Sequence, residues 1–199
     1  MIGVFSYTVI LTYISLFSAV TGIVTGFNGN ARMAVICLII SAVCDLFDGK
    51  IARTKKNRTK FEKDYGVQID SLNDMISFGI LPIIIGLSLN MSEWLYIPVY
   101  AIFALTGLIR LGYYNSLVNT SKNSEDEFVG IPITTSAIVC PILFLARRVS
   151  GFVYLYPFVL LLLSFLYISK IKVPKPRGKQ LYILLGLALL GIILVLFIK

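Results

Sequence analysis

Apolar stretches about twenty residues long recur along the whole of this chain, separated by short polar connections. A helix of roughly twenty apolar residues is long enough to cross the ~30 Å hydrocarbon core of a bilayer. The stretches are continuous and do not alternate between apolar and polar residues, so a closed β-barrel is not expected. The sequence therefore predicts an all-α, polytopic integral membrane protein. Seven spans are expected, at about residues 5–26, 31–54, 66–90, 94–117, 130–148, 151–171 and 179–198.

Composition supports this fold class and limits the partners of the chain. Of its 199 residues 57% are hydrophobic, and the mean hydropathy of +0.87 is far above that of a soluble domain. We expect one transmembrane domain over residues 1–199. The formal net charge is +8, but no soluble domain remains to bind nucleic acid. The positive charge is therefore expected to meet anionic lipid headgroups or a phosphorylated substrate.

The distribution of basic residues predicts an orientation in the membrane. Seven basic residues lie between Lys50 and Lys63, and five lie between Lys170 and Lys179. Because cytoplasmic loops are enriched in Lys and Arg, both loops are expected to be cytoplasmic. With seven spans they lie on the same side as the N-terminus. Arg147 and Arg148 then fall on the opposite side, which conflicts with the count of spans.

Four aspartates interrupt the second and third apolar stretches: Asp45, Asp48, Asp70 and Asp74. A charge inside the bilayer costs several kcal/mol, so intramembrane acids normally mark a functional site. Side chains three or four residues apart share a helix face, so each pair projects from one side of its helix. Oxygen ligands suit Mg²⁺ or Mn²⁺, and the chain has no His. We therefore predict a site for two divalent cations, with a buried ion network to the loop lysines as the alternative.

Small residues and one arginine accompany these acids. Gly49, Ala52 and Gly66 would let a bulky ligand approach the backbone closely. Arg53 is a permanently charged, planar donor that suits a phosphate group. Together with the acids, these residues indicate a diphosphate pocket near the basic loop. Without His, a general base must be a carboxylate, a Lys or a Tyr, and Asp74 is a candidate.

At this point the residues resemble a known family. The pattern Asp45-x2-Asp48-Gly49-x2-Ala52-Arg53, followed by Gly66-x3-Asp70-x3-Asp74, is similar to the signature of the CDP-alcohol phosphatidyltransferases, which are membrane enzymes of phospholipid synthesis. The run from Gly66 to Pro82, the L-I-R-L around Arg110, and F-V-G-I-P with Gly130 and Pro132 resemble the phosphatidylserine synthase branch. The resemblance covers about residues 10–172.

The chain departs from the family pattern in two places. The twelve residues 54–65 make a longer connection between Arg53 and Gly66 than the family usually has. In the first span, Thr12 fits a position where these enzymes often carry Thr. Ser15, however, stands where Asn is usual.

The resemblance implies a fold and a reaction. The fold would be a six-span core at about residues 5–172 with an additional C-terminal helix at about 179–198. The reaction would transfer a phosphatidyl group from a CDP-lipid, either CDP-diacylglycerol or an archaeal ether analogue, to the hydroxyl of L-serine and release CMP. A homodimer is also implied, and the basic loop next to the acids predicts an active site that faces the cytoplasm.

The resemblance also implies residue roles. The four aspartates would hold two Mg²⁺ or Mn²⁺ ions, and Asp74 would also take the proton from the acceptor hydroxyl. Residues that would bind the CDP-lipid are Thr12, Gly49, Ala52, Arg53 and Gly66. Arg110 is expected to bind the carboxylate of serine or the lipid phosphate, and Gly130 and Pro132 are expected to shape the acceptor pocket.

Two other functions remain open from the sequence. A related enzyme could use glycerol phosphate or inositol phosphate as the acceptor, and would need more basic residues facing the pocket. A cation transporter could also place acids inside the membrane. Transport, however, would not require Gly49, Ala52, Arg53 and Gly66 at fixed offsets from those acids.

Overall fold

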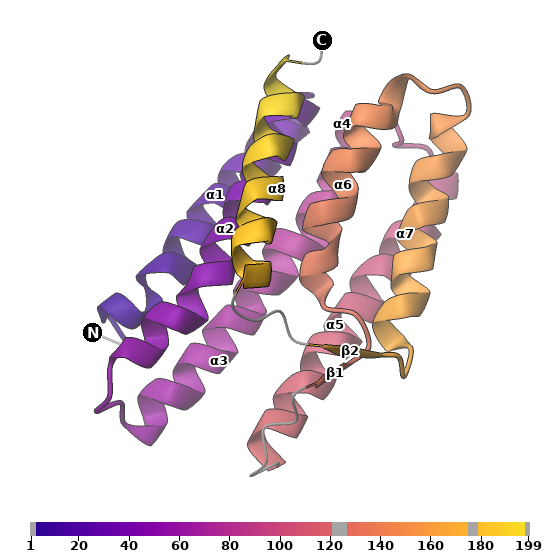
Figure 1. Ribbon diagram of the computed structural model, residues 1–199. Coiled ribbons are helices and arrows are strands. Elements are labelled where there is room, and N and C mark those ends of the chain that lie inside the picture. Colours follow the sequence, from indigo (N-terminus) through magenta and orange to yellow (C-terminus); the bar gives the residue numbers. More distant parts are fainter. Residues whose placement is uncertain (1–2, 121–126, 175–178, 198–199) are drawn as a thin grey trace.

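The computed structural model describes residues 3–120, 127–174 and 179–197, which form a bundle of helices running up and down along one direction (Figure 1). The predicted all-α membrane fold class is confirmed, and each expected span contains a helix. The helices are α1 (Ile10–Phe27), α2 (Ala31–Thr54), α3 (Lys60–Asp74), α4 (Leu81–Ser88), α5 (Ile97–Thr120), α6 (Ser136–Leu145), α7 (Phe152–Ile168) and α8 (Lys179–Phe197).

Helix length and composition identify the segments able to cross a bilayer. Among the described residues, three helical segments qualify: Tyr7–Phe27, Lys60–Ser88 and Trp94–Leu117. Phe152–Ile168 and Tyr182–Phe197 are shorter apolar helices. The count of seven spans therefore stays a prediction.

The third expected span begins earlier than its apolar stretch indicates. The helix starts at Lys60, and α3, a π-helical segment at Met75–Ile80 and α4 follow one another without a break. A capping box produces the early start, because Thr59 Oγ1 accepts from the Glu62 N–H at 3.1 Å and Glu62 Oε2 accepts from the Thr59 N–H at 2.9 Å. The loop between α2 and α3 is thereby shortened, and the first turns of α3 extend beyond the apolar stretch.

Only the middle of the span expected at residues 130–148 is α-helical. The α-helix covers only Ser136–Leu145, with 3-10 turns before and after it. Before it, the chain forms a short antiparallel ribbon that the sequence did not indicate. Strand β1 (Glu127–Val129) pairs with β2 (Lys172–Pro174), with Phe128 opposite Val173. The ribbon forms because the α5–α6 and α7–α8 connections emerge at the same end of the bundle, where their extended backbones can pair (Figure 1).

Close helix packing in the bundle depends on small residues. A Cβ at Gly22 of α1 would lie 2.8 Å from the Cys37 Cβ of α2, and one at Gly26 would lie 2.7 Å from Ile84 Cγ2. Glycine at both positions therefore lets α1 approach α2 and α4 closely. The core beneath them includes the fully buried Phe78, and it brings α2, α4, α5, α6 and α7 together.

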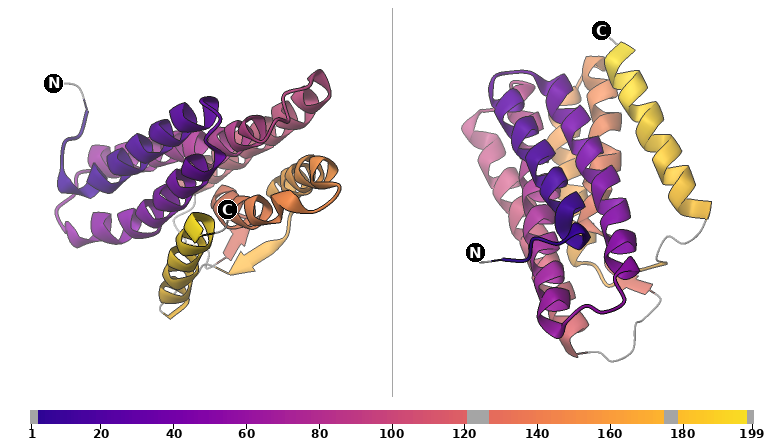
Figure 2. Two further views of the ribbon diagram at one scale, coloured as in Figure 1. Left: turned by 90° about the horizontal axis from the view of Figure 1, so that it is seen from above. Right: turned by 90° about the vertical axis from the view of Figure 1, so that its left-hand side faces the viewer.

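Helix α8 lies on the outside of the bundle, against α2 and α6 (Figure 2). Val195 is buried, whereas most apolar side chains on α8 are exposed, including Leu187 and Phe197. An apolar, exposed surface is what lipid contact requires. None of the candidate site residues lies on this helix.

Candidate metal centre

Two helices position the four aspartates near the end of the bundle that carries the α2–α3 loop. One carboxylate oxygen from each of Asp45, Asp70 and Asp74 lies within 4.8 Å of the others. Asp48, one helical turn after Asp45 on α2, is not in this group of three. Asp48 Oδ2 accepts a hydrogen bond from Thr12 Oγ1 of α1 at 3.2 Å. The packing of α2 against α3 therefore brings three acids together, and a hydrogen bond links the fourth to α1.

The environment of these acids fits a bound cation. Asp48 and Asp74 are buried, and Oδ1 of Asp70 and Oδ1 of Asp74 are buried without a hydrogen-bond partner among the described residues. An unpartnered buried carboxylate oxygen is unfavourable unless a cation or a donor compensates for its lost hydration. The donors in the group are all carboxylate oxygens, the type that Mg²⁺ and Mn²⁺ prefer.

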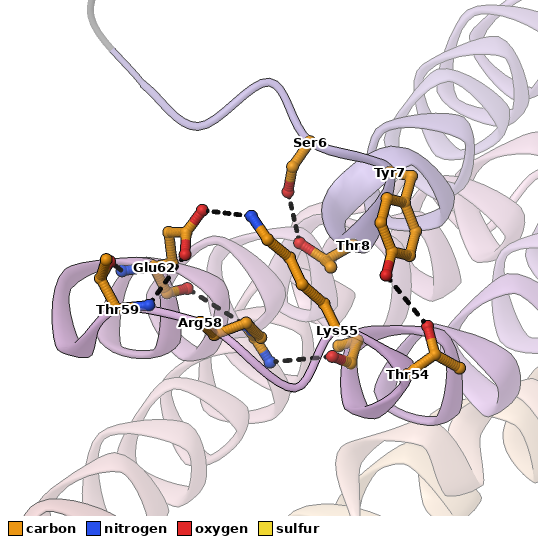
Figure 3. Close-up of polar contacts among 9 residues, drawn as sticks. Ser6, Tyr7, Thr8, Thr54, Lys55, Arg58, Thr59 and Glu62 are labelled. Atoms are coloured by element: carbon orange, nitrogen blue, oxygen red, sulfur yellow. Dashed lines mark hydrogen bonds and ion pairs between the residues drawn. The ribbon is translucent and has the colours of Figure 1, made fainter.

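A buried ion network with the loop lysines is not what the described residues form. Their ion pair joins Lys55 Nζ to Glu62 Oε1 at 2.6 Å, within the α2–α3 loop region (Figure 3). It includes none of the four aspartates. The acids therefore face one another, and the lysine of this loop is used to stabilise the loop itself.

The small residues expected to line a diphosphate pocket have different surroundings. A Cβ at Gly49 would meet nothing within 4 Å, so this position borders open space. A Cβ at Gly66 would lie 2.7 Å from Nη2 of Arg58. Ala52 is half-buried, and its carbonyl accepts from Arg58 Nη1 at 3.5 Å. Arg53 is exposed. The sequence did not single out Arg58, because its role depends on how the loop folds back.

A buried network of polar side chains connects α1, α2 and α3 near the acids. Asn73 Nδ2 donates to Ser15 Oγ at 3.0 Å, and Ser77 Oγ donates to Asn73 Oδ1 at 3.4 Å. Ser41 Oγ donates to the Ser15 carbonyl at 3.0 Å. Asn73 directly precedes Asp74, and Ser77 lies in the π-helical segment, a feature often found at functional sites. Sequence reasoning missed Asn73 and Ser41, although polar residues inside an apolar span were an available signal.

The residues expected to bind the acceptor meet at a second location. Arg110 is buried, and its Nε donates to the Ile131 carbonyl at 3.2 Å. Gly130 has φ +77°, and a Cβ there would lie 2.7 Å from the Tyr167 carbonyl and 3.4 Å from Arg110 Nε. Pro132 sits at the N-cap of the 3-10 turn before α6. Arg110 and Gly130 are therefore adjacent.

A cavity of about 190 Å³ opens beside Arg110. Its lining residues are Ile109, Arg110, Tyr113, Tyr167, Ile168, Ser169 and Lys170. None of the four aspartates lines it. The two regions are nevertheless linked, because Ser71 Oγ, next to Asp70, donates to Asn115 Oδ1 of α5 at 2.9 Å.

Comparison with known proteins identifies the family. The sequence profile of the CDP-alcohol phosphatidyltransferase family matches residues 6–168. The chain is 29% identical over 170 residues to archaetidylserine synthase of Methanothermobacter thermautotrophicus, covering 85% of this chain and 70% of that relative. It is 29% identical over 192 residues to a CDP-diacylglycerol–serine O-phosphatidyltransferase of Methanocaldococcus jannaschii, covering 94% and 88%.

A bacterial relative is similar over a smaller share of its length. The chain is 31% identical over 150 residues to the CDP-diacylglycerol–serine O-phosphatidyltransferase of Helicobacter pylori, covering 71% of this chain and 60% of that relative. The profile match alone includes both acid pairs, the basic loop and the Arg110 region. The chain therefore belongs to the CDP-alcohol phosphatidyltransferase family.

Proposed function

We propose that this protein transfers the phosphatidyl group of a CDP-lipid to the hydroxyl of L-serine and releases CMP, acting as a single transmembrane catalytic domain over residues 1–199. The observation that carries the proposal is the convergence of three carboxylates, two of which, Asp70 and Asp74, keep a buried oxygen without a hydrogen-bond partner among the described residues. The relatives named above support serine as the acceptor. Their names include both archaetidyl and diacylglycerol lipids, so the donor is proposed at the level of a CDP-lipid.

The acids have proposed roles in holding cations and moving a proton. We expect Asp45, Asp48, Asp70 and Asp74 to hold two divalent cations, Mg²⁺ or Mn²⁺, whose chemistry would be to neutralise charge on the diphosphate. Thr12 would orient Asp48 through its hydrogen bond. Asp74 would accept the hydroxyl proton of serine, since the chain contains no His and one Asp74 oxygen has no hydrogen-bond partner among the described residues.

The proposed reaction is a displacement at the phosphorus of the phosphatidyl group. The serine oxygen forms a bond to the phosphorus of the phosphatidyl group, while the bond from that phosphorus to the CMP oxygen breaks. CMP leaves with the electron pair, and the proton of the serine hydroxyl passes to the Asp74 carboxylate. Holding donor and acceptor in line at this position would supply much of the rate enhancement.

Substrate binding is assigned to residues around the acids. Gly49, which borders open space, and Ala52 would leave room for the nucleotide, and Gly66 would let the ligand approach α3 at the place where Arg58 Nη2 lies in this structure. Arg53 would neutralise phosphate charge. Arg110 would bind the serine carboxylate, with Gly130 and Pro132 shaping the acceptor site. The cavity is lined by Lys170 as well as Arg110, so both a carboxylate and a phosphate would meet positive charge there, and serine is favoured by the relatives named above.

We also propose an orientation in the membrane and an oligomeric state for the whole protein. The site would face the cytoplasm, because the basic α2–α3 loop lies at the same end of the bundle as the acids. A homodimer is expected from the family resemblance. Sedimentation of the detergent-solubilised protein would test the dimer.

The reaction is tested by measuring CMP release from CDP-diacylglycerol by the purified protein with Mg²⁺ or Mn²⁺. L-Serine, glycerol 3-phosphate and inositol phosphate are supplied in turn. We expect CMP release with serine and its loss on chelation of the metal. Release with a phosphorylated acceptor alone would replace serine by that acceptor, and no release with any of the three would contradict the proposal.

A further inference from the structure

The guanidinium of Arg58 lies on the face of α3 that carries the acids. Its Nη2 occupies the space beside Gly66, 2.7 Å from where a Cβ would stand. Gly66 lies one helical turn before Asp70, so the two positions share a stripe of the helix. Arg58 therefore places its guanidinium beside a position that lies one helical turn before Asp70, on the side of the loop.

The hydrogen bonds of Arg58 leave its charge without a carboxylate partner among the described residues. Nη1 donates to the Ala52 carbonyl at 3.5 Å, and Nη2 donates to the Glu62 carbonyl at 3.1 Å. Nε is buried and has no hydrogen-bond partner in the described part of the chain. Bonds from a guanidinium to neutral carbonyls are weaker than bonds to an anion. Arg58 therefore has both spare donors and unneutralised charge.

Glu62, the acidic residue closest to Arg58 along the chain, already has hydrogen-bond partners for both of its carboxylate oxygens. Oε1 of Glu62 accepts from Lys55 Nζ at 2.6 Å, and its Oε2 accepts from the Thr59 N–H at 2.9 Å (Figure 3). These contacts hold the loop backbone at both sides of Arg58. They also keep the Glu62 carboxylate from pairing with the guanidinium. The loop thus presents Arg58 toward the Gly66 face in a preorganised position.

We propose that Arg58 is a substrate-binding residue that contacts the diphosphate of the CDP-lipid from the loop side, opposite the carboxylate cluster. This inference rests on the proposed function, because it assumes a nucleotide diphosphate as the ligand. A diphosphate lying between the cation-binding acids and Arg58 would meet positive charge on both sides. Its oxygens would replace the carbonyl groups of Ala52 and Glu62 as acceptors for the guanidinium, giving charge-assisted, bidentate bonds.

Arg58 belongs to the long connection of residues 54–65, and the way this connection folds positions it beside Gly66. The capping box starts α3 at Lys60, which folds the extra residues into a short loop and an additional helical turn. Arg58 can then reach back across Gly66 only because no side chain stands there. Arg53 at the end of α2 and Arg58 in the loop would bind phosphate oxygens from two directions.

The test compares Arg58→Ala and Arg58→Lys with Lys56→Ala. Lys56 is an exposed residue of the same loop, so its substitution removes the same charge without touching the Gly66 face. Binding of CDP to the detergent-purified protein is measured by calorimetry in the presence of Mn²⁺, together with the KM values for CDP-diacylglycerol and L-serine. We expect Arg58→Ala to weaken CDP binding and raise the KM for CDP-diacylglycerol at least tenfold, with the serine KM within about twofold of wild type.

The remaining variants separate this role from others. Arg58→Lys keeps the charge but loses the planar fork, so an intermediate CDP affinity is expected. Equal CDP affinity of Arg58→Ala and Lys56→Ala would overturn the inference. Tighter CDP binding by Arg58→Ala than by the wild type would also overturn it, because the Arg58 side chain would then be blocking the space beside Gly66. A wild-type protein that neither binds CDP nor releases CMP would overturn the proposed function as well. If the wild type binds CDP and Arg58→Ala binds it equally well, the inference is overturned while the proposed function stands.

Discussion

At the scale of single residues, the acids differ in how they are held. Asp48 receives a hydrogen bond from Thr12, whereas Asp70 and Asp74 each keep a buried oxygen without a partner in the described part of the chain. Asp70 comes from the middle of α3 and faces Asp45 of α2. Removing the charge of a central ligand should therefore affect both cation binding and turnover.

We expect Asp70→Asn to lower kcat/KM by at least 10³-fold, because an amide is a weaker cation ligand than a carboxylate. The variant should also lose most of the rise in unfolding temperature that Mn²⁺ produces in the wild type. Asp64→Asn is the control, since Asp64 is exposed on the same helix and lies outside the cluster. A Mn²⁺ response of Asp70→Asn equal to that of Asp64→Asn would remove Asp70 from the metal site.

The hydrogen bond between Asn73 and Ser15 joins α3 to α1. Asn73 connects Ser15 of α1 to Ser77 within the buried network, so Asn73→Ala should lower stability by about 1–2 kcal/mol. Ser15 stands where the family usually has Asn. The double variant Ser15→Asn, Asn73→Ala returns an amide to the interface from the other helix and should recover part of the loss.

Thermal unfolding of the wild type, the single variants Ser15→Asn and Asn73→Ala, and the double variant in one detergent measures this coupling. Partial recovery in the double variant would indicate that the amide is needed at the interface, whichever helix carries it. If the two substitutions simply add, the hydrogen bond between Asn73 and Ser15 carries no coupling energy.

At the scale of elements, the ends of the helices depend on side chains more than on apolar length. The capping box starts α3 before its apolar stretch, and Arg147 donates to the Phe144 carbonyl at 2.9 Å where α6 ends. Its guanidinium also lies 4.1 Å from the centre of the Phe144 ring. Arg147 therefore has a structural role, which explains a basic residue at the end of the bundle opposite the α2–α3 loop.

The connection from β1 to α6 allows a matched test of backbone strain. Gly130 and Gly151 both have positive φ, but only Gly130 faces close neighbours, since a Cβ at Gly151 would meet nothing within 4 Å. Gly151→Ala should therefore cost about 1 kcal/mol from backbone strain alone, and Gly130→Ala should cost more. Because Gly130 lies against Arg110, Gly130→Ala should also raise the KM for serine.

Unfolding temperature and serine KM are the measurements for both variants. A serine KM of Gly130→Ala equal to that of Gly151→Ala would separate Gly130 from the acceptor site. Equal losses of stability would indicate that the neighbouring carbonyl of Tyr167 can move aside.

At the scale of the whole molecule, the helices alternate in direction so that the α2–α3 loop and the β ribbon lie at one end of the bundle (Figure 1). The α4–α5 and α6–α7 connections lie at the other end. This arrangement predicts sidedness in the membrane. The loop with Lys56 and the connection with Ser92 should face opposite compartments.

Labelling of introduced cysteines tests this topology, because the native Cys37, Cys44 and Cys140 are buried. With a membrane-impermeant maleimide, Lys56→Cys should react in inside-out vesicles and Ser92→Cys in right-side-out vesicles. The reverse pattern would place the proposed site outside the cytoplasm. Labelling of both from one side would contradict the alternation of the helices.

Much of the fold and the central acids could be predicted because both follow from local spacing. Apolar length predicts where helices lie, and intervals of three or four residues place Asp45 with Asp48 and Asp70 with Asp74. The ends of α3 and α6 were predicted less accurately than the positions of the helices, since capping and 3-10 turns depend on a few polar side chains. Arg58 and Asn73 were missed because their partners lie in another element.

The sequence by itself determined the class of fold, the acid-bearing faces of two helices and their association with small residues, because each depends on neighbours within about two turns of the chain. Only the tertiary structure decided that three acids converge, that Arg58 lies over Gly66, and that Arg110 meets Gly130 beside a cavity. These contacts join segments that are distant along the chain. Their geometry depends on how whole helices and loops pack, which no local pattern of residues specifies.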